Sequence, residues 1–242
     1  SIARKQPGGV RRWYVRGLRG GGGTWAGGSF GCGGDLKALH QASPEEAHRE
    51  VHLPMVALLN RLEALPVPVI CALEGYALGG GAEIALACDL RVAAKGAKIG
   101  FRQVRVGVSP GWGGSARLLR LVGRSRSLRI LWEARDMSGE EALSLGLVDE
   151  LVEDGLALET AIEIARGIAK GPPLAVAGVK AIFVLGGAEA SLELGGGTLP
   201  QDSYHDMAAR ELRIFQDLWA SEDHDEAVRA HQERRAPIYK GR

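Results

Sequence analysis

The sequence predicts a mixed α/β domain that ends in a helical part. Short apolar runs typical of buried strands alternate with helical patterns through the first two thirds of the 242 residues, and the pattern is helical from residue 156 onward. The 35 glycines cluster in a few places and mark loops, or points where a backbone must approach something closely. We therefore divide the chain into a core at 1–185 and a helical C-terminal subdomain at 186–242.

The first half of the chain alternates strand and helix patterns. A strand is predicted at 10–15, and after a glycine-rich loop Asp35 can cap a short helix. A long amphipathic helix is predicted from Pro44 to about Ala64. Further strands are predicted at 67–73, 90–93 and 99–108, with a buried helix at 82–87 between the first two.

The second half becomes progressively helical. Helices are predicted at 113–122 and 125–133. The four residues from Ser138 to Glu141 form a capping box, which opens a helix that stops at Gly146. A strand at 148–152 follows, and the remaining helices are predicted at 156–170, 174–185, about 206–220 and 223–235.

Composition excludes some classes of protein. A net charge of +1 gives no overall reason to expect nucleic acid or a membrane as partner. The chain has no run of about 18 apolar residues and no signal-peptide pattern, so we expect a cytoplasmic protein. Its three widely spaced cysteines give neither a disulfide framework nor zinc-ligand spacing. Residues 1–34 carry six cations and no acid, which suits a solvated chain end or an anionic ligand.

Three short motifs are too weak to assign a function. The G-x-S-x-G pattern of serine hydrolases occurs at 27–31 and 107–111, but chance explains it in so glycine-rich a chain. Residues 111–116 match a dinucleotide fingerprint, yet Trp112 stands where the backbone should approach a pyrophosphate. His48 and His52 share a helix face, but the glutamate that a zinc protease needs directly after the first histidine is absent.

Two glycine-rich segments carry more information when they are read together. Residues 29–37 and 66–91 each contain a glycine turn that leads into a predicted helix. Backbone N–H groups point freely out of a helix N-terminus, and glycine lets a ligand carbonyl reach them. Two such donors that converge on one oxygen form an oxyanion hole, in which each donor typically contributes a few kcal/mol.

These two segments resemble the enoyl-CoA hydratase/isomerase (crotonase) family. The distinctive parts are the turn at 32–36 and the stretch 66–91, with further matches at 107–114, 117–118 and 142–148. The resemblance implies a spiral of stacked ββα turns whose C-terminal helices form homotrimers or dimers of trimers. It also implies an acyl-CoA thioester as substrate, with CoA as substrate carrier rather than cofactor, a place in fatty acid metabolism, and no metal.

The resemblance also assigns roles to single residues. The backbone amides of Cys32 and Gly80 would hold the thioester oxygen, and Glu83 would be a general acid/base beside them. A C-terminal aromatic and lysine help cover CoA in this family, and they would fall on Tyr239 and Lys240. The other substrate-binding positions implied are Gly33, Asp35, Leu36, Gly79, Pro110, Gly111 and Trp112.

The sequence departs from the family pattern at three points. The hydratases carry a second glutamate twenty residues after the first, where this chain has Gln103, and an amide cannot shuttle a proton. Trp112 replaces a small residue and should narrow the acyl pocket. Only about 30 residues precede the Cys32 turn, roughly half of the usual number.

Three functions stay open on this basis. The first is a hydratase-type lyase in which Glu83 works alone or with a water network. The second is a decarboxylase or double-bond isomerase of the same family, which needs only one acid/base; a tryptophan at position 112 also resembles the ethylmalonyl-CoA decarboxylase branch. The third is an acyl-CoA-binding paralogue with weak catalysis.

Overall fold

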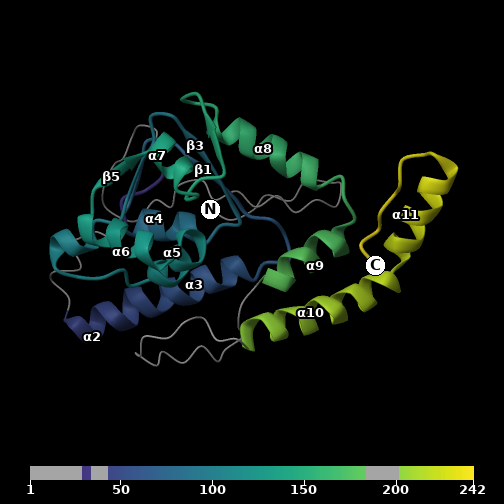
Figure 1. The fold of residues 1–242 in the computed structure, drawn as a ribbon, viewed down its shortest axis with the longest axis horizontal. Coiled ribbons are helices and arrows are strands. Elements are labelled where there is room, and N and C mark those ends of the chain that lie inside the picture. The colour runs from purple at the N-terminus through teal and green to yellow at the C-terminus, as the bar shows by residue number, and fades with distance from the viewer. Residues whose placement is uncertain (1–28, 34–42, 184–201) are drawn as a thin grey trace. The chain divides into compact units, whose positions relative to one another are not determined.

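The computed structural model describes residues 29–33, 43–183 and 202–242, which fall into two compact units (Figure 1). The first unit contains the described residues up to 63 together with 69–165, and the second contains 64–68 and the described part of 166–242. The predicted boundary between residues 185 and 186, the predicted strand at 10–15 and the predicted helix cap at Asp35 lie outside the described residues. They stay predictions.

Two small sheets form the core of the first unit, and the chain alternates between them. One sheet is fully parallel and consists of β1 (Ile70–Leu73), β3 (Leu90–Ala94) and β6 (Glu150–Val152). The other contains β2 (Tyr76–Leu78), β4 (Lys98–Gly100) and β5 (Asp136–Ser138), of which β2 and β4 are parallel and β5 is antiparallel. Because β1–β2 and β3–β4 each place one strand in each sheet, the second pair stacks on the first like successive turns of a spiral.

Two aspartates at equivalent places join successive turns of this spiral. Asp89, just before β3, accepts a hydrogen bond from the Val69 N–H just before β1, at 2.7 Å. One turn further on, Asp149 accepts from the N–H of Arg91 in β3, also at 2.7 Å. The buried Arg91 side chain adds an ion pair to Asp149 at 3.0 Å and donates to the Leu147 carbonyl at 2.8 Å. Each strand start thus receives an acceptor from the next turn, which fixes the register.

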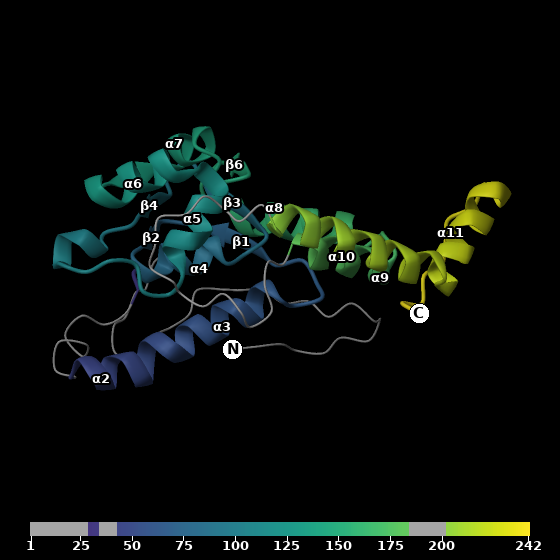
Figure 2. The same cartoon turned by 60° about the horizontal axis from the view of Figure 1, so that its bottom comes forward.

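Helices surround the sheets of the first unit (Figures 1 and 2). The long helix predicted from Pro44 is present as α2 (Pro44–Ala47), the π-helical turn η1 (His48–His52) and α3 (Leu53–Glu63). The buried helix α4 (Gly80–Leu86) follows β2 directly. The remaining helices are α5 (Gly114–Val122), α6 (Arg124–Glu133), α7 (Gly139–Ser144) and the start of α8 (Ala157–Ile168), close to the predicted ranges.

The prediction of one strand over residues 99–108 is wrong after Gly100. The chain leaves β4 there and forms a 3₁₀ turn, η2 (Gln103–Val106), which Gly107 closes in the left-handed region at φ 78°. The Arg102 side chain binds the Asp136 carboxylate of β5, which turns the chain away from the strand direction. The short strands β2 and β5 were not predicted, because three residues are too few to show a period.

The second unit is helical, as predicted. It contains α9 (Pro173–Phe183), α10 (Asp202–Trp219) and α11 (Glu222–Glu233). Helices α9 and α10 pack closely at Gly178, where an added Cβ would lie 2.8 Å from the Cγ2 of Ile214. Large apolar side chains remain exposed, namely Val179, Phe183, Leu212, Phe215, Trp219 and Ile238. The trimer or dimer of trimers stays a prediction. Within the described ranges, no helix is both long and apolar enough to cross a membrane.

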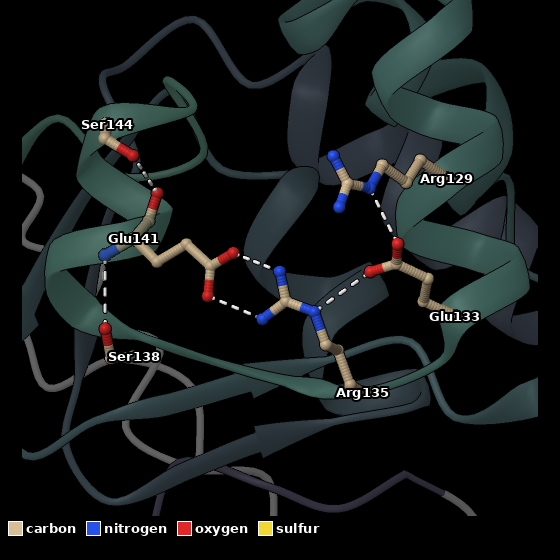
Figure 3. A network of polar contacts seen from close by, with 6 residues as sticks. All are labelled: Arg129, Glu133, Arg135, Ser138, Glu141 and Ser144. Atoms are coloured by element: carbon tan, nitrogen blue, oxygen red, sulfur yellow. Dashed lines mark hydrogen bonds and ion pairs between the residues drawn. The ribbon is translucent and has the colours of Figure 1, made fainter.

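Arg135 joins the end of α6 to the start of α7 (Figure 3). Its guanidinium donates to Glu133 at 3.0 Å and to both carboxylate oxygens of Glu141. The Ser138 hydroxyl accepts from the Glu141 N–H at 3.2 Å, which is one half of the predicted capping box. The other half is absent, because the Glu141 carboxylate binds Arg135 rather than the Ser138 N–H.

We expect Arg135→Gln to lower thermal stability at neutral pH by about 1–3 °C. Arg129 and Arg135 lower the pKa of Glu133, and Arg135 lowers the pKa of Glu141. Carboxylates whose pKa is lower in the folded protein stabilise it above their ordinary pKa, and this stabilisation is lost as the pH falls through the lowered values. The difference in melting temperature from the unmutated protein should therefore shrink progressively as the pH falls below the ordinary glutamate pKa, and should also shrink in about 1 M salt.

Arg126→Gln is the matched control for this test. Arg126 is also exposed on α6, and no ion pair is found for it among the described residues. The substitution removes the same charge and should leave the melting temperature unchanged. A pH-independent difference between Arg135→Gln and the unmutated protein would contradict the role given to the two glutamates.

Candidate active site

A short backbone pairing brings the turn at residues 31–33 against the start of α4. Gly31 forms a parallel bridge with Ala77 of β2. Its N–H donates to the Tyr76 carbonyl, and its own carbonyl accepts from the Leu78 N–H, both at 2.9 Å. The turn therefore extends the second sheet by a single bridge and ends beside Gly80. Nearly fifty residues separate this turn from Gly80 in the sequence.

The approach of these two segments requires glycine. A Cβ on Gly81 would overlap the Gly31 carbonyl, and a Cβ on Gly33 would lie 2.8 Å from the Gly80 nitrogen. Gly33 also has a φ of +87°, which other residues rarely adopt. Gly79, at φ 53° and ψ −119°, turns the chain into α4 while its N–H donates to the Gly100 carbonyl at 2.8 Å. The predicted contact positions Gly33 and Gly79 thus have a structural reason for being glycine.

Two backbone N–H groups at this junction remain available. Within the described ranges, neither the Cys32 N–H nor the Gly80 N–H has a hydrogen-bond acceptor. They belong to the two segments that meet, and they are the two donors predicted for an oxyanion hole. Burial raises the pKa of the Cys32 thiol, even though the Arg102 cation acts in the opposite direction, so the thiolate form is disfavoured.

Glu83 lies beside this junction, in the first turn of α4, with only 2% of its surface exposed. Its Oε2 accepts from the backbone N–H groups of Trp112 at 2.9 Å and Gly114 at 2.8 Å. Its Oε1 accepts from Gln103 Nε2 at 2.9 Å and from the Gly111 N–H at a long 3.4 Å. Oε1 is therefore the oxygen with room for a further donor.

Gln103 reaches Glu83 from η2, and this leaves one of its own polar atoms without a partner. Because its amide nitrogen donates to the carboxylate, its Oε1 points elsewhere; this oxygen is buried and receives no hydrogen bond from the described residues. A buried acceptor without a donor costs about 1–3 kcal/mol. A water or a ligand that donates to this oxygen would remove that cost.

Trp112 covers the start of α4. A Cβ on Gly80 would overlap ring atoms Cζ3 and Cη2 of its indole and lie 2.9 Å from Cε3, so the ring rests directly on the glycine backbone. The residue is 8% exposed. Gly111 directly precedes Trp112 on the same loop. The ring of His52, from η1, lies about 4 Å from where a Gly111 side chain would begin, with Cδ2 at 3.9 Å and Nε2 at 4.0 Å.

Arg117 fixes the loop that carries Trp112, a role that its sequence pattern does not predict. Its Nη1 donates to the Trp112 carbonyl at 2.8 Å, and its Nη2 donates to Asn60 at 2.9 Å and Glu63 at 2.8 Å, both on α3. The side chain is 4% exposed. A buried arginine inside an amphipathic helix pattern has no signal of its own; only its place in the family-like pair at 117–118 pointed to it.

The other predicted site residues lie apart from this cluster or outside the described residues. Pro110 is half-buried next to Gly111, and Asp35 and Leu36 are outside. Tyr239 and Lys240 lie in the second unit, where the Lys240 N–H donates to the buried Asp223 carboxylate at 2.6 Å. Their predicted role in covering CoA stays a prediction. The described part of the chain contains no group of three or more metal-ligating side chains.

Known proteins resemble this chain over most of its length. The family model described as "Enoyl-CoA hydratase/isomerase" matches residues 23–242. An enoyl-CoA isomerase/hydratase of Mycosarcoma maydis is 34% identical over 214 residues, which are 88% of this chain and 73% of that protein. A probable mitochondrial enoyl-CoA hydratase of Arabidopsis thaliana is 37% identical, and the chain spans 66% of its length.

Solved structures show the same fold. The crystal structure of an enoyl-CoA hydratase from Bacillus anthracis superimposes with a TM-score of 0.78 at 34% identity, covering 90% of this chain and 79% of that one. An enoyl-CoA hydratase from Polaromonas gives a TM-score of 0.76 at 28% identity, covering 89% and 79%. The predicted crotonase-type spiral is thereby confirmed.

We expect Gly81→Ala to lower the free energy of unfolding by about 1–3 kcal/mol, the usual cost of an extra methyl group in a packed core. The methyl group would push the Gly31 carbonyl out of its close approach. Gly167→Ala is the matched control, because Gly167 lies in helix α8 with open space around it and should tolerate the change or gain stability. Chemical denaturation measures both. Equal stability of the two variants would contradict the close approach.

Proposed function

The chain belongs to the enoyl-CoA hydratase/isomerase family, and on that basis we propose that it reversibly adds water to an enoyl-CoA thioester, with Glu83 as its single acid/base. CoA is then part of the substrate, and neither a cofactor nor a metal takes part. The observation that carries this proposal is the buried Gln103 oxygen beside Glu83, which has no hydrogen-bond donor in the described part of the chain. It marks a place where a hydrogen-bond donor belongs, next to the group that would move a proton.

The N–H groups of Cys32 and Gly80, which find no acceptor among the described residues, suit the charge that develops in this reaction. When water attacks C3 of the enoyl group, the π electrons move toward the thioester and the negative charge collects on its oxygen. Two N–H donors at that oxygen stabilise the enolate, and each is worth roughly 3 kcal/mol in comparable sites. Because both donors are backbone groups fixed by the sheet and by α4, they need no reorganisation during the reaction.

A water molecule would complete the polar groups around Glu83 Oε1. The Gly111 N–H, at 3.4 Å from that oxygen, can donate to a water, while Glu83 Oε1 and Gln103 Oε1 can each accept from it. One donor and two acceptors match what a single water offers. Gly111 is exposed, so water can reach this point from solvent.

One carboxylate is enough to balance the proton transfers. Glu83 takes a proton from the water as the water oxygen bonds to C3, and the electrons pass to the enolate. The enolate carbon C2 then takes that proton back from Glu83, so that one water has been added and the carboxylate is regenerated. Gln103 cannot carry a proton, and its role here is to hold the water in place.

The alternative functions differ in the substrate groups that would face Glu83 and Gln103. The carboxylate of an alkylmalonyl-CoA has only acceptors, so it would face two acceptor oxygens on Glu83 and Gln103, which disfavours decarboxylation. A double-bond isomerase needs only Glu83, and the relative from Mycosarcoma maydis carries both activities in its name. A binding paralogue is favoured by the four N–H groups that already engage the carboxylate.

We expect Glu83→Gln to abolish hydration of crotonyl-CoA, with a loss of at least about 10³-fold in kcat, because the amide cannot move the proton. The affinity for butyryl-CoA should change little, because the N–H donors and the pocket remain. Loss of absorbance of the enoyl thioester measures the reaction, and calorimetry measures binding. Full turnover by folded Glu83→Gln would refute the assignment, while binding without turnover by the unmutated protein would support the paralogue.

Substitutions of Gln103 separate the remaining functions. Gln103→Leu should lower hydration by about 10-fold or more, because the water loses an acceptor, and Gln103→Glu should raise it by adding a second proton carrier. For a decarboxylase, measured as carbon dioxide release from ethylmalonyl-CoA, Gln103→Glu should instead slow the reaction by like-charge repulsion. Gln216→Glu, at an exposed site on α10, is the control for the added charge.

A further inference from the structure

We propose that Trp112 sets the length of the acyl chain that this site accepts, and restricts it to short acyl groups. The inference rests on the proposed function, because it takes Gly80 as a donor to the thioester oxygen and Glu83 as the acid/base. It adds to that function the substrate class and the residue that selects it.

Trp112 contacts both groups that a substrate must reach. Its indole rests on the backbone of Gly80, whose N–H would bind the oxygen at C1. Its own N–H donates to Glu83 Oε2 at 2.9 Å, and that carboxylate must act at C2 and C3. An acyl group that extends from one to the other therefore runs beside the indole, and the next carbons of a longer chain meet its ring.

The backbone that carries the indole is fixed, and the side chain is buried. This backbone is held on both sides, by the N–H that binds Glu83 and by the carbonyl that accepts from Arg117 at 2.8 Å. Arg117 is itself buried and anchored to α3 through Asn60 and Glu63. The ring also lies against bare backbone at Gly80, so no flexible side chain beneath it can yield.

A second ring lies near the neighbouring side. Gly111, whose N–H faces Glu83 Oε1, stays exposed, and the His52 ring of the long helix lies about 4 Å from where its side chain would begin. The indole of Trp112 is therefore the large side chain that contacts the glycine start of α4. In a fixed pocket a single methylene changes the specificity constant by roughly 10- to 200-fold, so a ring at this place is enough to select short chains.

The test is the chain-length profile of Trp112→Ala against trans-2-enoyl-CoA substrates of four, six, eight and ten carbons. The unmutated protein should prefer the four-carbon substrate. Trp112→Ala should raise the ratio of kcat/KM for the ten-carbon to the four-carbon substrate by at least about 10-fold. Trp112→Phe should lie between the two. Trp132→Ala is the matched control, since Trp132 is 70% exposed on α6 and its loss should leave the profile unchanged.

Binding measurements keep this test separate from the proposed reaction. Calorimetry with saturated acyl-CoA thioesters of the same lengths needs no turnover, so it reports on the pocket even if the reaction is a different one. A gain of about 10-fold in affinity for decanoyl-CoA, relative to butyryl-CoA, in Trp112→Ala supports the proposal. An unchanged length profile in both folded Trp112 variants, checked by circular dichroism, would overturn it.

Discussion

The backbone contact between residues 31–33 and the start of α4 is the constraint on which the site depends. Gly31 lies so close to Gly81 that a side chain on Gly81 would overlap the Gly31 carbonyl. This approach brings together the two segments that carry the N–H groups of Cys32 and Gly80, at the point where α4 begins. Because Glu83 is one turn into that helix, the position of the carboxylate follows from the same contact.

The loop at 111–114 forms the second half of the site, and Arg117 anchors this loop to α3. Its N–H groups bind Glu83 from outside the helix, while Arg117 binds the Trp112 carbonyl and connects the loop to α3. The carboxylate is thus placed by α4 and oriented by the loop. The ion pair joins the buried Arg117 to the partly exposed Glu63, so an arginine that lost this partner would be left as a buried charge without its counter-ion.

The sequence predicted most helices and the strands of the first sheet, because long periodic segments are local signals, and the glycine-turn pair directed attention to Glu83, whose role stays a prediction. It did not predict β2 and β5, whose three residues each carry no period, nor the 3₁₀ turn that contains Gln103. That turn depends on Arg102 binding Asp136, 34 residues later. The contacts of Arg117 and the lack of a partner for the Gln103 oxygen among the described residues could not be predicted either, because the burial of a polar atom depends on residues distant in sequence.

The indole of Trp112 occupies the space in which a side chain of residue 80 would stand, and this couples the residue types that the two positions can hold. An alanine at position 80 would force the tryptophan ring to shift, but would have room beside a small residue at position 112. The cost of substituting either position therefore depends on which residue occupies the other, although they lie 32 residues apart in the chain.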